Sequence, residues 1–334
     1  MNAPVTSREL AKRLGVSQST ISRAFSDHAS IHPEMRERVF EAARAAGYTP
    51  NVIARALSTR RSAMIGIVMG GFQNPFYAML LDLLSPALQA AGFQTLLFNV
   101  APGEELDDKL TLLGQYHVDA VVIASATISS RMARRWTDAG RRAVLFNRLV
   151  PDSDVPSVVC DNEAGAAQIA EHFLSRGRRR LAFIAGPGDT ATSIAREQGF
   201  TRHLHTGGST PIATVRAGEY SYEAGFEAAR ALAAKQPDAV FCANDILALG
   251  TIDALRRAPG HQTRRNVAVA GFDDIPMAAW PGYSLTTVRQ PLAAMVATTI
   301  DLLQRSLGGE KLPTAPIALP GELIIRASST EIPP

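Results

Sequence analysis

The spacing of hydrophobic residues divides the chain into a short helical head and a long body. Between residues 6 and 47, apolar positions recur every three or four residues, as on the buried face of an α-helix. The pattern breaks at Gly15 and again before Pro33. It therefore predicts three helices: one from Ser7 to the glycine, a second after Ser17, and a third from Pro33 to Gly47.

Local signals mark the ends of these predicted helices. Thr6 and Glu9 have the spacing of a capping box, and proline is well suited to the first position of a helix. Gly15 and Gly47 can adopt the left-handed conformation that ends a helix. His32 is a weak start signal for the third helix, since Ser or Thr would cap it better. The first two helices with their tight turn are typical of a helix-turn-helix.

From residue 64 onwards, short apolar runs alternate with helical stretches. The runs at 64–69, 94–98, 120–123 and 143–146 are separated by predicted helices at 76–91, 106–116 and 131–139. A second series starts near Val158, with helices at 164–175, 193–205, 222–234 and 246–256, and strands at 181–184, 239–242 and 267–270. Such alternation predicts parallel sheets covered on both faces, and two series predict two lobes.

The charges are distributed unevenly along the chain. Residues 1–61 hold ten Lys or Arg against five Asp or Glu, which gives +5; because the whole chain carries +3, the remainder carries −2. A basic head on a mildly acidic body is typical of a module that binds a polyanion. The alternative is an ordinary solvated helical surface.

Several classes of protein are disfavoured by the sequence. The first residues contain no apolar run and no eighteen-residue apolar stretch exists, so we expect neither a signal peptide nor a membrane span, but a cytoplasmic protein. Cys160 and Cys242 lie in apolar runs and are expected to be buried free thiols. No nucleophile elbow and no H-E-x-x-H or C-x-x-C spacing occurs, so we expect no enzyme, no metal and no cofactor.

The second helix of such a head lies in the major groove of DNA, where its first residues meet base edges. Those residues are Gln18, Ser19 and, one turn later, Arg23. Glutamine pairs well with adenine and arginine with guanine. Short hydroxyl side chains are better suited to phosphates, which position a head without reading sequence. The predicted phosphate and positioning residues are Thr6, Ser7, Ser17, Thr20 and Ser22.

Three motifs in this region resemble the lactose/galactose repressor (LacI/GalR) family: VSxxTISR at 16–23, RERV at 36–39 and GYxPNxxARxL at 47–57. The resemblance implies that residues 51–58 form a hinge helix only on DNA, where it inserts a leucine into the minor groove. The matching hinge residues are Asn51, Ala54, Arg55 and Leu57. A helix of about eight residues is too short to be stable alone. The sequence departs from the family pattern at Ser26, where asparagine is usual, and at His32.

The body also resembles this family, whose core is similar to periplasmic sugar-binding proteins of type I. The motifs are NPFY at 74–77, CDNxxG at 160–165, CANDxxAxG at 242–250, GFDDIP at 271–276 and LTTVRQP at 285–291. The predicted fold class is thus α/β, with an all-α head. The domains are a helix-turn-helix at 1–50, a hinge at 51–61 and an effector-binding and dimerisation body at 62–334. Its N-lobe takes about 62–160 and 290–320, and its C-lobe about 161–289 and 321–330.

The ligand of such a body lies beyond the carboxyl ends of the strands, in the cleft between the lobes. Asn147 and Arg148 follow a predicted strand directly. The family resemblance adds an aromatic wall, an effector contact, a stacking ring and two polar anchors: Phe76 and Tyr77, Arg196, Tyr220, and Asn244 with Asp273. Alternative roles are core packing for the aromatic pair and helix capping for the two anchors.

The resemblance implies a homodimeric transcriptional regulator, most often a repressor, that binds a near-palindromic double-stranded operator and a small effector. The effector is a sugar, a sugar acid or a phosphosugar; Arg148 with Arg196 favours an anion. Ile194 stands where members that bind simple sugars often carry arginine, so their specificity is not transferred. Two alternatives stay open: a regulator with a vestigial pocket that responds to a protein partner, and a solute-binding protein for uptake.

Overall fold

A computed structural model describes residues 5–25, 31–49, 61–100, 113–124, 140–150, 153–188, 190–257 and 267–330. It divides into two compact units, Met1–Ala63 and Met64–Pro334. The predicted hinge helix, the helix predicted at 131–139 and most of that at 106–116 lie outside the described residues, as does Ser26.

The head contains the three helices that the sequence predicts: α1 (Ser7–Leu14), α2 (Gln18–Ala24) and α3 (Pro33–Ala46). The capping box is formed, because the Thr6 hydroxyl accepts from the Glu9 amide and the Glu9 carboxylate accepts from the Thr6 amide. Gly15 and Gly47 end their helices in the left-handed conformation, with φ of 68° and 62°. His32 makes no side-chain cap, as predicted.

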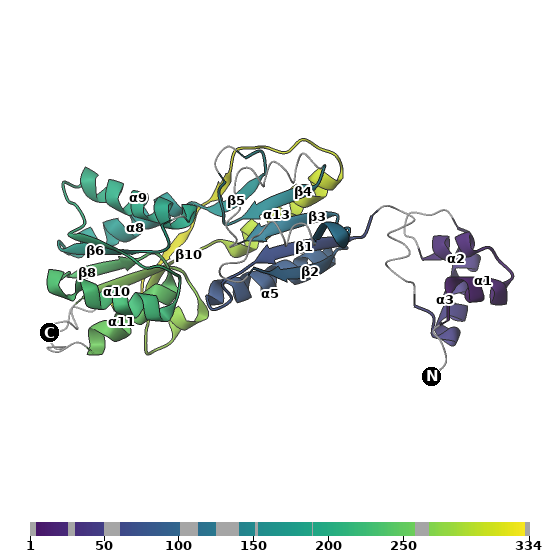
Figure 1. The fold of residues 1–334 in the computed structure, drawn as a ribbon, viewed down its shortest axis with the longest axis horizontal. Helices are drawn as coiled ribbons and strands as arrows, with labels where there is room; N and C mark the ends of the chain where they lie inside the picture. Colours follow the sequence, from purple (N-terminus) through teal and green to yellow (C-terminus); the bar gives the residue numbers. More distant parts are fainter. Residues whose placement is uncertain are drawn as a thin grey trace. The chain divides into compact units, whose positions relative to one another are not determined.

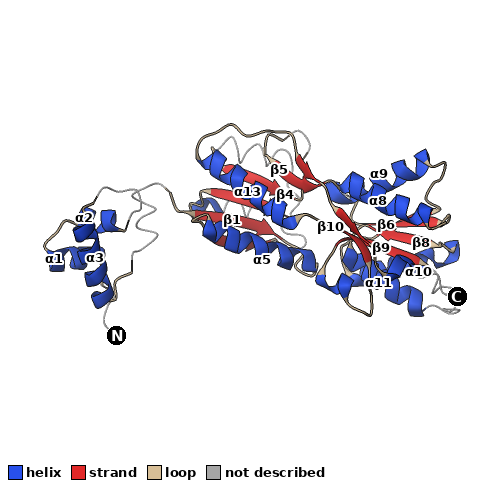
Figure 2. Cartoon of the chain, turned by 180° about the vertical axis from the view of Figure 1, so that it is seen from behind, coloured by secondary structure: helices blue, strands red, loops and turns tan. Residues whose placement is uncertain are grey.

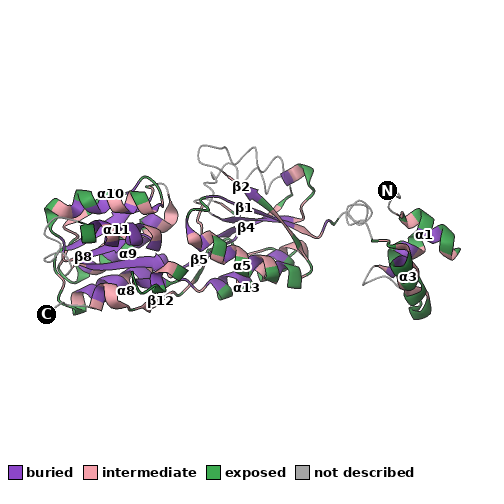
Figure 3. Cartoon of the chain, turned by 90° about the horizontal axis from the view of Figure 1, so that it is seen from below, coloured by how far each residue is buried: buried purple, intermediate pink, exposed green. Residues whose placement is uncertain are grey.

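A small hydrophobic core holds these helices together. It is built from the residues that the helical periodicity places on the inner faces, and the outward faces of α1 and α3 are largely exposed (Figure 3). The buried members are Leu10, Ala11, Ile21, Ala24, Val39 and Ala43. Phe25 packs against them and against the ring of Phe40, at 5.1 Å between centroids.

The first lobe of the body is a six-stranded sheet in the order β11-β5-β4-β3-β1-β2. All its pairings are parallel. Helices α5 (Pro75–Ala90) and α13 (Leu292–Leu307) pack against each other on one side of the sheet (Figure 3). The strands are β1 (Met64–Met69), β2 (Gln94–Asn99), β3 (Ala120–Ala124), β4 (Arg142–Phe146), β5 (Ser157–Cys160) and β11 (Ile317–Leu319).

The second lobe is also a six-stranded sheet, in the order β12-β10-β9-β8-β6-β7. Its strands are β6 (Leu181–Ala185), β7 (Ala213–Arg216), β8 (Ala239–Cys242), β9 (Ala268–Asp273), β10 (Thr286–Arg289) and β12 (Glu322–Ile324). Helices α8 (Asn162–Ser175) and α9 (Ala191–Thr206) cover one face, and α10 (Tyr222–Leu232) and α11 (Asp245–Arg257) cover the other (Figures 1 and 2). Short helices η1 (Ala233–Lys235), η2 (Pro276–Ala279) and α14 (Ala327–Thr330) complete it.

The chain passes between the two sheets three times: after β5 into α8, after β10 into α13, and between β11 and β12. The lobes therefore share three crossover segments and are not independent halves of the sequence. The polar residues that follow β5 and β10 lie at these crossovers.

The sequence pattern missed several elements, among them β7, β10, β11 and α13, and one strand direction. β7 is a four-residue edge strand with alternating exposure, so it has no apolar run to reveal it. α13 is a regular amphipathic helix that the predicted alternation did not include. The pair β10–β12 is antiparallel, although a parallel sheet was predicted, because the chain returns from the other lobe through β11 and a tight crossover.

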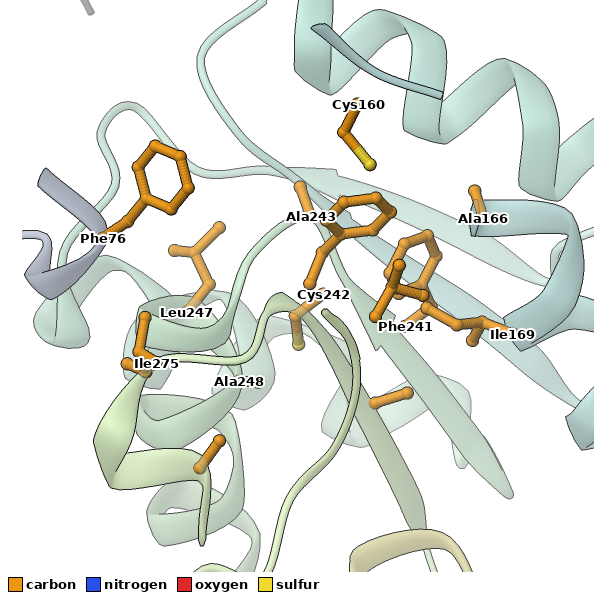
Figure 4. Close-up of a cluster of buried hydrophobic side chains, with 14 of the residues drawn as sticks. Phe76, Cys160, Ala166, Ile169, Phe241, Cys242, Ala243, Leu247, Ala248 and Ile275 are labelled. Carbon is orange, nitrogen blue, oxygen red and sulfur yellow. The ribbon is translucent and has the colours of Figure 1, made fainter. Parts of the chain in front are cut away.

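The core of the body is continuous across both sheets. Figure 4 shows part of it, with the Phe76 ring from α5 in the same buried cluster as Leu247 and Ile275. Cys160 and Cys242 belong to this cluster and are free and buried, as predicted. Burial raises the pKa of each thiol to about 12, so both stay protonated near neutral pH.

Candidate functional site

The start of α2 presents an exposed polar surface. Gln18, Ser19 and Arg23 are all exposed, whereas Ile21 and Ala24 of the same helix are buried in the head core. The Gln18 amide donates to the Ser7 hydroxyl at 2.8 Å and so connects the starts of α2 and α1. Arg23 lies one turn after Ser19, with 3.5 Å between Nη2 and the hydroxyl oxygen. The three predicted base-reading side chains therefore share one exposed face.

Two predicted phosphate residues act as helix caps in the structure. The Ser17 hydroxyl accepts from the Thr20 amide at 3.1 Å and contacts the Thr20 hydroxyl at 2.9 Å. Thr6 caps α1 in the same way. The backbone N–H of Thr6 lowers the pKa of the Glu9 carboxyl, which strengthens the capping box near neutral pH. Ser7 and Ser22 lie at solvent-accessible positions, and the hinge residues Asn51, Ala54, Arg55 and Leu57 fall outside the described residues.

In the body, a buried ion pair joins two predicted effector residues. Arg196, in the second turn of α9, lies 3.3 Å from Asp273 at the end of β9, and both side chains are at most 4% exposed. The guanidinium also donates to Asn162 Oδ1 at 2.8 Å and to the Ala243 carbonyl at 2.5 Å. It stacks 3.8 Å over the Phe272 ring. Each nitrogen of Arg196 thus has a partner within the protein, and Asp273 balances its charge.

The backbone at the end of β9 adopts an uncommon conformation. Asp273 and Asp274 have backbone φ angles of 124° and 56°, values that residues other than glycine rarely adopt. Each carboxylate is held by cations: Asp273 by Arg196, and Asp274 by Arg289 and Arg326, both at 2.7 Å. Such conformations cost about 1–3 kcal/mol each and concentrate at functional sites.

A second buried carboxylate lies close to Asp273. Asp245 is fully buried and accepts from the Thr287 hydroxyl at 2.6 Å and the Ile275 amide at 2.8 Å. Burial raises the pKa of Asp245 to about 8, and the Asp273 carboxylate adds to the effect. Burial also raises the pKa of Asp273, to about 6, against the opposing effect of Arg196. The two carboxyls thus raise one another's cost of ionisation, and the Arg196 guanidinium offsets this cost at Asp273.

Tyr220 lies in the loop that follows β7 and packs against the loop that follows β6. Its side chain covers Gly186, where an added Cβ would lie 2.3–2.5 Å from two ring carbons and the hydroxyl oxygen. Its hydroxyl is 3.2 Å from the Thr190 hydroxyl, and the Gly186 amide donates to Ser193. The packing of the tyrosine thus requires a glycine at position 186.

For three candidates the structure shows the alternative role. Phe76 is 2% exposed and belongs to the hydrophobic core, with Tyr77 packed edge-on at 5.4 Å between centroids. Asn244 accepts from the Leu247 amide at 3.2 Å and so caps α11. Tyr77 is half-buried. These contacts neither require nor prevent an effector role for the same residues.

Asn147 and Arg148 follow β4, as predicted. Asn147 is left-handed, with φ of 52°, and its amide donates to the Val158 carbonyl at 2.8 Å. Its side-chain oxygen is buried and accepts no hydrogen bond from the described residues. The Arg148 carbonyl accepts from the Ser157 hydroxyl, which fixes the turn after the strand.

Sequence reasoning missed two members of the network around Asp273. Asn162 binds Arg196, and Gln290 donates to Asp273 Oδ1 at 2.7 Å while its own Oε1 is buried without a partner among the described residues. Both lay within motifs that carried the family resemblance. Their position just after the ends of β5 and β10 was the signal that could have identified them.

Comparison with known proteins identifies the family. Residues 62–311 match the periplasmic binding proteins and sugar-binding domain of the LacI family, and residues 6–51 match the bacterial regulatory proteins of the lacI family. The chain belongs to the LacI family of bacterial regulatory proteins. It is accordingly a DNA-binding transcriptional regulator with a body of the sugar-binding type.

Relatives of this LacI-family chain match it over nearly its whole length. The HTH-type transcriptional regulator CelR of Thermobifida fusca is 32% identical over 329 residues, 96% of each chain. A solved complex of CelR with cellobiose covers 97% of this chain and 100% of the other, at 29% identity and a TM-score of 0.72. The lac repressor dimer bound to operator and the anti-inducer ONPF shares the fold, with a TM-score of 0.86 at 23% identity. The match covers 98% of this chain and 99% of that chain.

Two further properties concern only the part of the chain that the structure describes. None of its helices combines the length and the apolar character needed to cross a bilayer. Within the same residues, no three His, Cys, Asp or Glu side chains gather in a way that would hold a metal ion.

Proposed function

We propose that this LacI-family regulator binds a near-palindromic operator as a homodimer and acts as a repressor whose DNA affinity is set by a small effector. Two-fold symmetry of the protein requires two similar half-sites, each read by one head. The exposed Gln18, Ser19 and Arg23 supply donors and acceptors that suit base edges. Because its partner is chromosomal DNA, we infer a cytoplasmic location and no catalytic role.

The observation that carries the effector proposal is the buried Arg196–Asp273 pair at the carboxyl ends of the C-lobe strands. Its hydrogen bonds reach Asn162, Gln290 and the Ala243 carbonyl. Buried polar groups without a packing role are costly, so a network of this kind marks a binding site. Asn147, Arg148, Tyr220 and Asn244 stay proposed effector contacts because of the family resemblance and their positions after strand ends.

We infer that the effector is a neutral polyhydroxylated molecule, although Arg148 and Arg196 favoured an anion. The charge of Arg196 is balanced by Asp273, and two buried side-chain oxygens that follow strand ends, Asn147 Oδ1 after β4 and Gln290 Oε1 after β10, accept no hydrogen bond from the described residues. Sugar hydroxyls donate to such oxygens, whereas a carboxylate or phosphate would face them with like partial charge. CelR, which is similar over its whole length, has been solved with cellobiose.

The effector proposal is tested by thermal unfolding of the full chain with cellobiose and other neutral sugars, and with their acid and phosphate derivatives. A neutral sugar at about 100 times its dissociation constant should stabilise the body by about 2.7 kcal/mol. Asp273→Asn should abolish that gain, and Asp253→Asn, on the far end of α11, should keep it. Stabilisation by acids alone would contradict a neutral effector. A chain that no small metabolite stabilises would favour control by a protein partner.

A further inference from the structure

The three crossover segments meet at one place in the body. The Asp161 amide, after β5, donates to the Leu319 carbonyl at the end of β11 at 2.7 Å. Gly321, in the third crossover, has no space for a side chain: an added Cβ would lie 3.1 Å from Cys160 Sγ and 3.2 Å from the Arg289 carbonyl. We call these contacting segments, residues 160–161, 289–291 and 319–321, the crossover bundle. Any change in the relative orientation of the two lobes requires changes in the backbone torsions of this bundle.

The first connection from the bundle to the buried ion pair is Asn162. Its side-chain amide donates to the Cys160 carbonyl at 2.8 Å, and its Oδ1 accepts from Arg196 Nε at 2.8 Å. Asn162 is 7% exposed, so water does not compete well for either bond. One side chain thus bridges the first crossover and the guanidinium.

The second connection is Gln290, in the next crossover. Its amide donates at 2.7 Å to Asp273 Oδ1, the same oxygen that lies 3.3 Å from Arg196. Gln290 is 3% exposed. The two halves of the ion pair are therefore each attached to a different crossover segment, one through Asn162 and the other through Gln290.

We propose that Asn162 and Gln290 are positioning residues that couple the Arg196–Asp273 pair to the crossover bundle. This inference rests on the proposed function, in which the effector contacts that pair. A ligand that draws Asp273 or Arg196 towards itself changes two hydrogen bonds, and each ends on a segment that joins the lobes. Conversely, a lobe movement that shifts the bundle changes the geometry of the pair. Such coupling is reciprocal by thermodynamic necessity.

The chain provides a matched control on the same helix. Gln168 of α8 also holds a crossover, because it donates to the Gly321 carbonyl and accepts from the Leu323 amide, both at 3.2 Å. No hydrogen bond connects Gln168 to Arg196 or Asp273 in the described residues. Gln168→Leu should therefore loosen a crossover contact and leave the hydrogen bonds of the ion pair intact. Asn162→Leu and Gln290→Met should each remove one of the two hydrogen bonds that attach the ion pair to a crossover.

The ligand-free full chain is sufficient for the first measurement, which is hydrogen exchange with water of the Arg196 Nε–H followed by arginine-selective NMR. The Arg196→Lys variant assigns the signal. Loss of a buried, charged hydrogen bond should make exchange at least about tenfold faster in Asn162→Leu, with a smaller increase in Gln290→Met. Gln168→Leu should leave it unchanged. Equal rates in all variants, or equal acceleration in all three, would overturn the proposal.

Asn162→Asp serves if the leucine variant fails to fold. It keeps an acceptor for Arg196 but lacks the donor to the Cys160 carbonyl, so slow exchange at Arg196 should persist. Fast exchange in this variant would show that Oδ1 is not the acceptor that holds the guanidinium. No effector is used in this measurement, so a failure to find a stabilising sugar would count against the proposed function and leave this result standing.

The effect of the ion pair on the crossover bundle is measured at the Asp161 amide, because this amide is hydrogen-bonded to Leu319 within the bundle. Removing the guanidinium in Arg196→Leu should accelerate its hydrogen–deuterium exchange by about tenfold. Arg202→Leu is the control, since Arg202 also joins α9 to α8 through Glu163 but is 67% exposed. Acceleration in the control but not in Arg196→Leu would also overturn the coupling.

Discussion

At Thr6 and Ser17 a single hydroxyl starts a helix and also lies on the surface that we expect to face DNA. In the free chain both hydroxyls accept backbone N–H groups of their own helices. A hydroxyl that is used in this way can still donate to a phosphate oxygen, because it carries one donor and two acceptor sites. Capping and phosphate contact are therefore compatible roles for the same residue.

Removal of the α1 cap should weaken the head alone. Thr6→Ala should cost about 1 kcal/mol of head stability, because the Glu9 amide loses its acceptor and the capping box is broken. The loss is measured from amide exchange of head residues in the full chain. Ser22→Ala, an exposed hydroxyl within α2, is the control and should change little; an equal loss there would contradict the cap.

Arg23 is expected to read a base. Arg23→Ala should reduce affinity for the preferred duplex by about 1–3 kcal/mol and relax the choice of base at one position. Arg44→Ala is the control, since Arg44 is an exposed arginine of α3 that pairs with Glu37 at 3.1 Å. Selection from a randomised duplex library gives both preferences. An unchanged preference in Arg23→Ala would remove its base-reading role.

At the scale of elements, two glycines set the distance between α10 and α11. A Cβ on Gly250 would lie 2.0 Å from the Tyr222 carbonyl, and a Cβ on Gly225 would lie 2.2 Å from the Leu247 carbonyl. The two helices thus approach each other backbone to backbone, and each glycine faces the other helix. At its start, α11 also lies against the end of β9, where Asp245 accepts from the Ile275 amide.

Gly250→Ala should force these helices apart. We expect a loss of about 1–3 kcal/mol in the free energy of unfolding of the body, because backbone atoms cannot move aside as a flexible side chain can. Gly218→Ala, with nothing within 4 Å of its added Cβ, should stay within about 0.5 kcal/mol of the unsubstituted chain. Denaturant titration of both variants measures the difference, and equal stabilities would contradict the close packing.

At the scale of the whole molecule, a buried hydrogen-bonded chain attaches the last helix to the C-lobe. His172 of α8 lies 2.8 Å from the Ser329 hydroxyl of α14, which in turn lies 2.5 Å from the Thr286 hydroxyl of β10. All three side chains are at most 6% exposed. Residues more than 150 positions apart are joined in this way.

The buried His172 in this hydrogen-bonded series should make the stability of the protein depend on pH. Burial, and to a lesser extent the charge of Arg176, lowers the pKa of His172 below its ordinary value. Below about pH 6.5 this histidine therefore takes up a proton in the unfolded chain that it does not take up in the folded chain. The contribution of neutral His172 to stability is thus full above that pH and falls as the pH drops.

The difference in unfolding free energy between pH 7.5 and 5.5 should be smaller in His172→Gln by about 1 kcal/mol. Denaturant titration at both pH values gives this quantity. His205→Gln, in the exposed last turn of α9, is the control. If both variants kept the pH dependence of the unsubstituted chain, the buried histidine would not be its source.

The sequence by itself determined the parts of this protein that depend on neighbouring residues. The helices of the head follow from Thr6, Ser17, Gly15 and Gly47, because caps and left-handed turns are formed within a few residues. Most strands and helices of the body follow from short apolar runs and their spacing. The edge strand β7 escaped because its stability comes from pairing with β6, which no local pattern records.

Only the tertiary structure decided which polar residues meet. Asn162, Arg196, Asp273 and Gln290 are separated by up to 128 positions, and their hydrogen bonds exist because three crossovers bring strand ends together. The balance of charge was likewise decided there: the Arg196 guanidinium, which the sequence suggested as an anion contact, is paired with the Asp273 carboxylate at the end of β9. Charge in a folded protein depends on distances through space, and these are set by topology.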